Sequence, residues 1–138
     1  MRKRDLRLEK YGISKNRYAE LQAFARQYPE WLEELEEKQD TVGSPSFDGM
    51  PKGTKVGDST GSLATRRVML SRKCTVVEEA LEEAGGDMMM YLFYGVCQGD
   101  SFENMKLTLE IPCERDTYYD MRRYFFYILD EKVEKMHI

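Results

Sequence analysis

The sequence predicts an all-α protein with an N-terminal helical pair, a glycine- and proline-rich linker, a long helix and a C-terminal helix-turn-helix. Three observations favour this fold class. Apolar residues recur at spacings of three and four over most of the chain, and serine residues stand where helices can begin. One long stretch breaks the helical period with glycine and proline. At 138 residues, 41% of them hydrophobic, the chain is long enough for one domain with a buried core.

The first region, residues 1–40, contains the two predicted N-terminal helices. The basic start of the chain is expected to fray. Ser14 can cap the first helix, and Pro29 stops or bends it and can occupy the first turn of the next. The second helix, residues 30–39, carries Trp31 as a large core anchor with glutamates around it. We expect the two helices to pack as an antiparallel, amphipathic pair.

Residues 41–58 form the predicted linker or arm. Its spaced glycines do not follow the order of a phosphate-binding loop, because the pattern GxxxxGK[ST] is missing. Lys52 and Lys55 make the segment basic, so an arm that lies along DNA phosphates is one interpretation. A plain linker is the other.

The third region, residues 59–138, begins with the long helix. Ser59 or Thr60 can cap it, and Gly85-Gly86 ends it. Its apolar side is marked by residues at helical spacing: Leu63, Arg67, Leu70, Cys74, Val77 and Leu81. The first half is basic and the second half acidic, which opposes the helix dipole. This order suggests that another helix or a partner contacts the basic half, which includes Arg66 and Arg67.

Two short helices are predicted next. Asp87 is expected to cap a helix that is buried on all sides, and Met88–Met90 are expected to fill the core rather than form an adaptable binding surface. Gly95 and Gly99 are expected to bound a turn. Ser101 can cap the following helix, whose predicted inner stripe is Phe102, Met105 and Leu109.

A turn of about four residues around 111–113 and a last helix from residue 114 or 115 complete the outline of a helix-turn-helix. The helical wheel assigns one side to the core: Tyr118, Met121, Phe125, Ile128 and Leu129. Arg115, Tyr119 and Arg123 lie on an adjacent side with Asp116 nearby, and Arg122 lies at the boundary. Guanidinium groups bind guanine edges and phosphate oxygens, and tyrosine can donate to phosphate or stack. The alternative is an ordinary bundle helix whose arginines pair with neighbouring acids.

Several classes of function are disfavoured by composition. The sole histidine, His137, supports no catalytic triad, and three cysteines without a CxxC pair suggest reduced thiols rather than a metal site or disulfide framework. We therefore expect no enzyme, no metal and no cofactor. No apolar run spans a membrane and no secretory signal is evident, so a cytoplasmic location is expected. The net charge of −4 conceals alternating blocks, of which residues 51–73 carry six basic and one acidic side chain.

Several groups of residues resemble those of late-gene transcription activators of the RinA and ArpU type, which phages and prophages of Gram-positive bacteria encode. In the C-terminal region the likeness rests on Ile111-Pro112-Cys113, Arg115-Asp116, Tyr118-Tyr119-Asp120, Arg122-Arg123 and Phe125-Phe126. The other groups are residues 44–51, 57–60 and Tyr28-Pro29-Glu30-Trp31. The family usually has Asp-Pro-Thr where this chain has Asp58-Ser59-Thr60, so a proline at the first helical turn is missing here.

The resemblance implies a helix-turn-helix similar to region four of sigma factors and a sequence-specific DNA-binding activator of phage late or packaging genes. Its expected partner is double-stranded DNA inside the bacterial host cell. Host RNA polymerase and a second copy of the chain are further candidate partners. The expected DNA-binding residues are Arg115, Asp116, Tyr119, Arg122, Arg123, Lys52, Lys55, Arg66 and Arg67. Two alternatives remain: a DNA-packaging protein like the small terminase subunit, and a helical module that binds or inhibits another protein.

Overall fold

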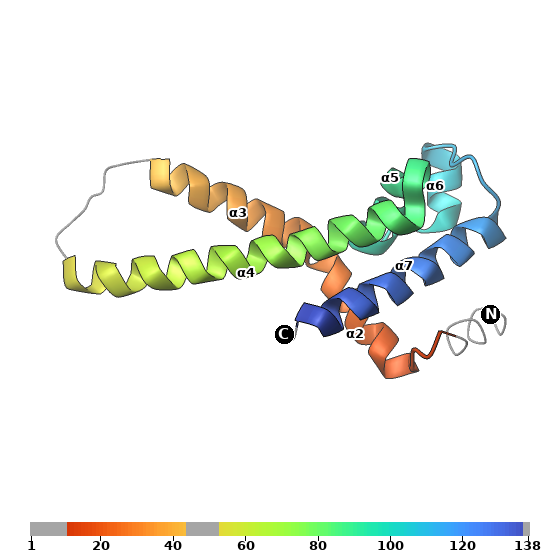
Figure 1. Ribbon diagram of the computed structural model, residues 1–138. Coiled ribbons are helices and arrows are strands. Elements are labelled where there is room, and N and C mark those ends of the chain that lie inside the picture. The colour runs from red at the N-terminus through yellow and green to blue at the C-terminus, as the bar shows by residue number, and fades with distance from the viewer. Residues whose placement is uncertain (1–10, 44–52, 137–138) are drawn as a thin grey trace.

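The structure, a computed structural model, describes residues 11–43 and 53–136, and every regular element in these ranges is a helix (Figure 1). The predicted all-α class is therefore confirmed for this part of the chain. The basic start of the chain and residues 44–52 lie outside the described residues. Among the described residues, no helix is both long and apolar enough to cross a membrane.

The N-terminal helices form where the sequence predicts them but do not form the predicted antiparallel pair. Helix α2, Lys15–Arg26, is capped by Ser14, whose Oγ accepts a hydrogen bond from the Arg17 backbone N–H at 3.1 Å. Helix α3, Tyr28–Gly43, follows after a single residue, Gln27. One residue is too short to reverse the chain, because helix–helix connections usually need two or more. The antiparallel pairing was a wrong prediction.

Helix α3 instead lies antiparallel to the first half of the long helix α4, Gly53–Gly85 (Figure 1). This helix begins before the predicted caps at Ser59 and Thr60, so residues 53–58 belong to a helix and not to the linker. Residues 41–43 likewise belong to α3. The predicted end of the long helix at Gly85 is confirmed.

The reversed charge pattern of α4 has partners within the chain. Glu34 on α3 forms an ion pair with Arg66 on the basic half, with Oε1 at 3.0 Å from Nη2. Lys132 pairs with the acidic half, at 3.1 Å from Glu79 and 3.5 Å from Glu83. The expected contact of the basic half of α4 with another helix is therefore present, and α3 supplies it through Glu34.

After α4, a 3-10 turn, η1 (Gly86–Met88), leads into helix α5, Met89–Gln98. Asp87 lies inside this turn and makes no side-chain cap, which corrects the prediction that it caps the helix. Met90 is 53% exposed and Met89 is exposed as well, so α5 is not buried all round. The methionines lie on its outer side because its inner side is already filled by Leu92, Gly95, Val96 and Cys97.

The sequence predicted that Gly95 and Gly99 bound a turn, but only one of them does. Gly95 is buried in the middle of the helix, whereas Gly99 ends it in the left-handed region at φ 77°. Glycine favours this conformation because it has no Cβ. Only Gly99 therefore marks the turn.

The core lies where α2, α4, α5 and the last helix, α7 (Arg115–Met136), meet (Figure 1). The wheel placed the α7 core correctly: Tyr118, Phe125, Ile128 and Leu129 are buried and Met121 is partly buried. The sequence missed Phe126, which is fully buried and packs its ring edge-on against Tyr18 at 5.1 Å between centroids. Because α7 is covered from two sides, its buried stripe is wider than a single helical face.

Candidate nucleic-acid interface

The last two helices have the order that the sequence predicts for a helix-turn-helix. Helix α6, Phe102–Thr108, is capped by Ser101, whose Oγ accepts from the Asn104 N–H at 3.0 Å. Residues 109–114 connect it to α7, so the connection is longer than the predicted four residues. Phe102 and Tyr118 join the two helices, with ring centroids 5.6 Å apart.

The connection between α6 and α7 turns at Glu110. This residue is in the left-handed region at φ 52°, which is strained for a residue with a Cβ. The turn also leaves Leu109 exposed, although the sequence assigned it to the inner stripe with Phe102 and Met105. Helix α6 ends before Leu109, so the helical spacing no longer directs that side chain inward.

The first turns of α7 present Arg115, Asp116 and Tyr119 at the surface or partly so. The Arg115 guanidinium carbon lies 5.3 Å from the centre of the Tyr119 ring, and Arg115 also pairs with Glu103 on α6. Both partners of this ion pair are about half exposed, and such pairs contribute ~0–1 kcal/mol. An anionic ligand could therefore displace Glu103 at little cost. These three residues are the part of the predicted site that the structure brings together.

Arg123 does not lie on this surface. Its side chain is 7% exposed, and it forms an ion pair with Asp120 on its own helix. Arg123 precedes Phe126 and Tyr127 by one turn, and these rings contact Tyr18 and Tyr11 of the N-terminal segment. The N-terminal segment thus covers the later turns of the side of α7 that the helical wheel had left open to DNA, whereas Arg115 and Asp116 in the first turn stay exposed. Assigning Arg123 to the DNA-binding surface was a wrong prediction.

Arg122, predicted at the boundary of the wheel, is partly buried. Its guanidinium carbon lies 5.3 Å from the centre of the Phe126 ring. Burial by itself would lower the pKa of this guanidinium, but the hydroxyls of Tyr18 and Tyr118 beside it hold that pKa above its ordinary value. Arg122 therefore remains charged in an environment that is largely aromatic.

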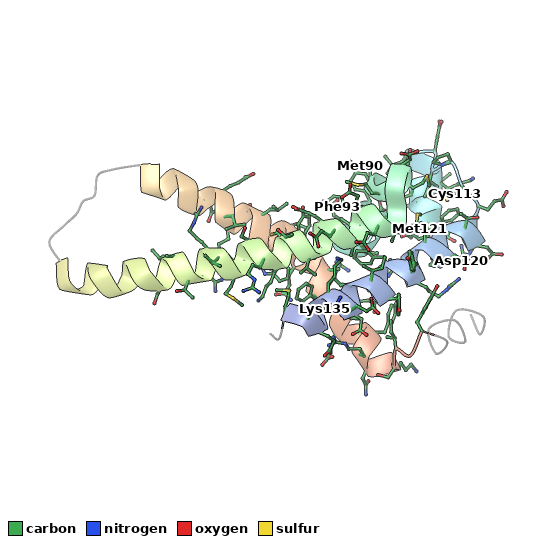
Figure 2. The ribbon with its side chains drawn as sticks, viewed as in Figure 1. Met90, Phe93, Cys113, Asp120, Met121 and Lys135 are labelled. Atoms are coloured by element: carbon green, nitrogen blue, oxygen red, sulfur yellow. The ribbon has the colours of Figure 1, made fainter. Side chains whose placement is uncertain are left out.

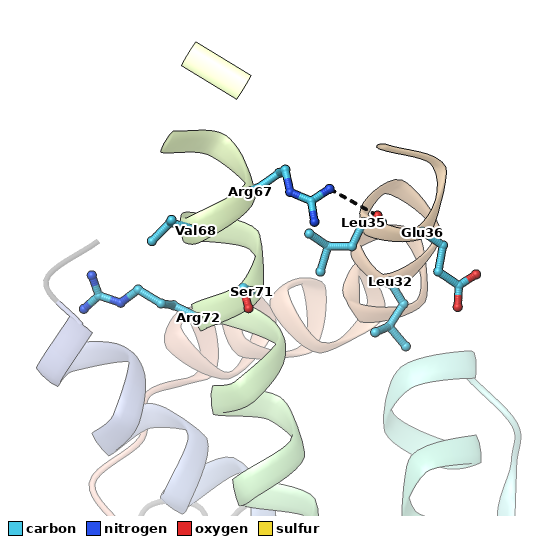
Figure 3. Close-up of a pocket in the computed structure, with 7 residues that line it drawn as sticks. All are labelled: Leu32, Leu35, Glu36, Arg67, Val68, Ser71 and Arg72. Carbon is cyan, nitrogen blue, oxygen red and sulfur yellow. Dashed lines mark hydrogen bonds between the residues drawn. The ribbon is translucent and has the colours of Figure 1, made fainter. Parts of the chain in front are cut away.

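The basic half of α4 is engaged with α3. Arg66 pairs with Glu34, and Arg67 Nη1 lies 3.5 Å from the Leu35 carbonyl oxygen across a groove of about 470 Å³ (Figure 3). Lys73 lies over the Trp31 ring at 5.3 Å. Arg66 remains exposed, so its contact with phosphate stays a prediction that requires it to leave Glu34. Arg72 lines the same groove on its α4 side (Figure 3).

The side chains of the two lysines of the predicted arm lie outside what the structure describes. Lys52 lies outside the described residues, and at Lys55, in the first turn of α4, only the backbone is described. Their role in DNA binding stays a prediction.

One basic residue near this surface was missed. Arg26, at the end of α2, lies close to α5, where it opposes the rise in the pKa of the buried Cys97 thiol that burial causes. In the sequence it looks like the favourable basic residue of a last helical turn. Nothing local relates it to α7, because the two are brought together only by the packing of α2 on α5 and α7.

In the part of the chain that the structure describes, no group of three or more histidine, cysteine, aspartate or glutamate side chains is arranged to hold a metal ion. Cys74, Cys97 and Cys113 are free thiols. Burial raises the pKa of Cys74 to about 11 and that of Cys97 to about 12. These two cysteines are therefore core residues rather than nucleophiles.

No protein-family model matches the chain, and no curated protein or solved structure matches it either. Function is therefore inferred from the residues and from the resemblance that the sequence itself carries.

Proposed function

We propose that this protein is a sequence-specific double-stranded-DNA-binding regulator that activates phage late or packaging genes, as the RinA and ArpU-type resemblance implies. The observation that supports it best is the cluster of exposed Arg115 and Asp116 with partly exposed Tyr119 on the first turns of α7, the helix that follows a short capped helix. In helix-turn-helix proteins the start of the second helix meets the base edges. In this proposal α7 is the recognition helix and α6 lies across the backbone.

The chemistry of the cluster suits this role. A guanidinium can form two parallel hydrogen bonds with guanine or with a phosphate, and Asp116 can accept from a cytosine amino group. Tyr119 supports the Arg115 guanidinium on its ring, which limits the orientations of the fork. The total charge of −4 favours selective binding over a general coating of DNA.

The test is a binding titration with DNA fragments from around the protein's own gene. We expect Arg115→Ala to weaken specific binding by ~1–3 kcal/mol without changing the melting temperature, because the side chain is exposed. Lys135→Ala is the matched control, since Lys135 is an exposed cation at the opposite end of α7 from Asp120 (Figure 2). If no fragment is bound specifically at ~100 mM salt, the DNA-binding proposal fails.

A reporter gene behind the phage late promoter separates the activator from a packaging protein. Activation by this protein without other phage proteins supports the activator. Specific binding without activation favours the packaging role, which also requires DNA recognition. The DNA-binding titration, repeated with and without host RNA polymerase, then shows whether the polymerase is a direct partner.

A protein-interaction module is the second candidate because large apolar side chains are exposed on α5 and α6. On α5, Met90 is 53% exposed and its neighbour Met89 is exposed as well, and on α6 Leu107 is 82% exposed. Exposed apolar groups of this kind are common at protein-binding surfaces. Met90→Ser with Leu107→Ser leaves DNA binding unchanged if α7 reads DNA, and abolishes partner capture if these side chains form the functional surface.

A further inference from the structure

A cavity of about 240 Å³ lies where α2, α5 and α7 meet the connection between α5 and α6. Its wall carries two guanidinium groups, Arg26 from α2 and Arg122 from α7, and one carboxylate, Asp100, from the connection before α6. A buried water occupies about 30 Å³, so the cavity has room for a small tetrahedral ion and several waters. The charged groups on its wall sum to a net positive charge.

Neither arginine is neutralised by an acid within the described part of the chain. No ion pair there includes Arg26, and the main groups that raise the pKa of the partly buried Arg122 are the hydroxyls of Tyr18 and Tyr118. The Asp100 carboxylate instead accepts a hydrogen bond from the Asn104 side-chain amide at 2.6 Å. A partly buried cation without a counter-charge is unfavourable unless an anion accompanies it.

Two glycines shape the cavity around these groups. The Arg26 guanidinium lies over Gly99 so closely that a Cβ at position 99 would be 2.8 Å from Nη1. At Gly95 a Cβ would be 1.8 Å from the Tyr118 Oη. This hydroxyl is fully buried on the cavity wall, and no hydrogen bond of ordinary geometry satisfies it. Gly99 thus leaves room for Arg26, and Gly95 leaves room for the Tyr118 hydroxyl, a donor in addition to the two guanidinium groups.

We propose that this cavity binds a phosphate group between the Arg26 and Arg122 guanidinium groups, with the Tyr118 hydroxyl as a further donor. Charge-assisted bonds from guanidinium to phosphate oxygens are among the strongest hydrogen bonds in proteins. The phosphate supplies a negative counter-charge for the Arg122 guanidinium and accepts the hydrogen bond that the Tyr118 hydroxyl can donate. The binding is reversible and no covalent step is involved.

The source of the phosphate follows from Tyr119, which lines the cavity and also contacts Arg115 of the candidate interface. A duplex read by the first turns of α7 would bring its backbone beside the cavity, so the phosphate is a backbone phosphodiester. This assignment rests on the proposed function. Free inorganic phosphate has the same recognition chemistry and is the alternative source.

The first arm of the test measures DNA affinity against salt concentration for the full chain and for Arg26→Gln. Losing one phosphate contact should reduce the slope of log affinity against log salt by ~0.9. Arg26→Lys should keep the slope but lower the affinity, because it keeps the charge and loses the fork. Lys135→Gln makes the same charge change away from the cavity and should leave the slope unchanged.

The second arm measures melting temperature in sodium phosphate and in sodium chloride at equal ionic strength. Phosphate should raise the melting temperature of the unmodified chain and of Lys135→Gln, but not that of Arg26→Gln. The Arg26 side chain is exposed and is not part of the described core. We therefore expect Arg26→Gln to fold.

The outcomes separate this inference from the proposed function. Arg26-dependent effects in both arms support a backbone-phosphate site. A phosphate effect without any specific DNA binding supports the site as one for free phosphate and overturns the DNA-binding function. Specific DNA binding with an unchanged slope in Arg26→Gln and no phosphate effect overturns the site and leaves the function standing. Equal effects in Lys135→Gln overturn the site, because they show general electrostatics only.

Discussion

The hydroxyl of Tyr118 on α7 occupies the space that a side chain at position 95 of α5 would need, since a Cβ there would be 1.8 Å from Oη and 3.0 Å from Cζ. Helices α5 and α7 can approach this closely only because residue 95 is glycine. The contact fixes Tyr118 against α5, and Tyr118 in turn packs on Phe102 of α6. The Gly95–Tyr118 contact thus couples three helices around the candidate interface.

We predict that Gly95→Ala destabilises the protein by about 1–3 kcal/mol through overpacking, even though alanine favours helix by ~1 kcal/mol over glycine. Thermal or urea unfolding measures the change. Gly61→Ala is the matched control, because nothing lies within 4 Å of a Cβ at that helical position. Adding Tyr118→Phe to Gly95→Ala should recover part of the loss, since it removes the closest atom. Equal stability of Gly95→Ala and the unmodified chain would show that α7 can move away from α5 freely.

Arg123→Ala should lower the free energy of unfolding by about 1–3 kcal/mol, because the side chain is buried and pairs with Asp120. The exposed Arg115→Ala should not do so. Chemical denaturation of both variants gives the comparison. Unchanged stability of Arg123→Ala together with weaker DNA binding would contradict the buried position and restore the prediction from the helical wheel.

Phe126→Ala should cost about 3–5 kcal/mol, as should Phe125→Ala, because both rings are fully buried and pack against each other at 4.9 Å between centroids. Tyr124→Ala, at an exposed neighbouring position, should cost far less. Circular dichroism during thermal unfolding provides the measurement. A small loss for Phe126→Ala would mean that α2 does not cover α7 as described.

Glu110→Gly should stabilise the protein, because glycine adopts the left-handed conformation of residue 110 without the ~1–2 kcal/mol penalty of a Cβ. Part of this gain is offset, since glycine makes the unfolded chain more flexible. Glu110→Ala keeps the Cβ and removes the charge, so it serves as the control and should not stabilise. A gain of equal size in both variants would trace the effect to charge instead of backbone strain.

Above about pH 9 the protein should lose stability as the pH rises, because the thiol of Cys97 has an ordinary pKa of 9.0 and a folded pKa of about 12. In this range the unfolded thiol releases its proton while the buried thiol keeps it, so the unfolded state binds fewer protons and becomes favoured. Cys74, whose pKa is raised to about 11, acts in the same direction.

Cys97→Ala tests this pH dependence. Its melting temperature should fall less steeply between about pH 9 and 11 than that of the unmodified chain, whatever the offset at neutral pH. Alkylation at neutral pH gives an independent check, because the partly exposed Cys113 should react before the buried Cys74 and Cys97. Parallel pH profiles of the two proteins would show that Cys97 is not protected by burial.

The sequence predicted the features that depend on neighbouring residues. Ser14 and Ser101 cap helices at the predicted positions because a hydroxyl three residues before a free N–H acts locally. The core side of α7 followed from its helical spacing, which placed Tyr118, Phe125 and Leu129 correctly. The surface cluster of Arg115, Asp116 and Tyr119 at the start of α7 was found from the same spacing.

Long-range packing decided the rest. Helix α3 packs on α4 and not on α2. The single residue between α2 and α3 is too short to reverse the chain, and Glu34 on α3 pairs with Arg66 on α4. Arg123 is buried because a distant N-terminal segment covers its side of α7, which no helical wheel of α7 alone can include. Arg26 and Arg122 face one cavity for the same reason. Periodicity specifies which side of a helix is apolar, whereas the tertiary structure alone specifies which helix covers it and which charges then meet.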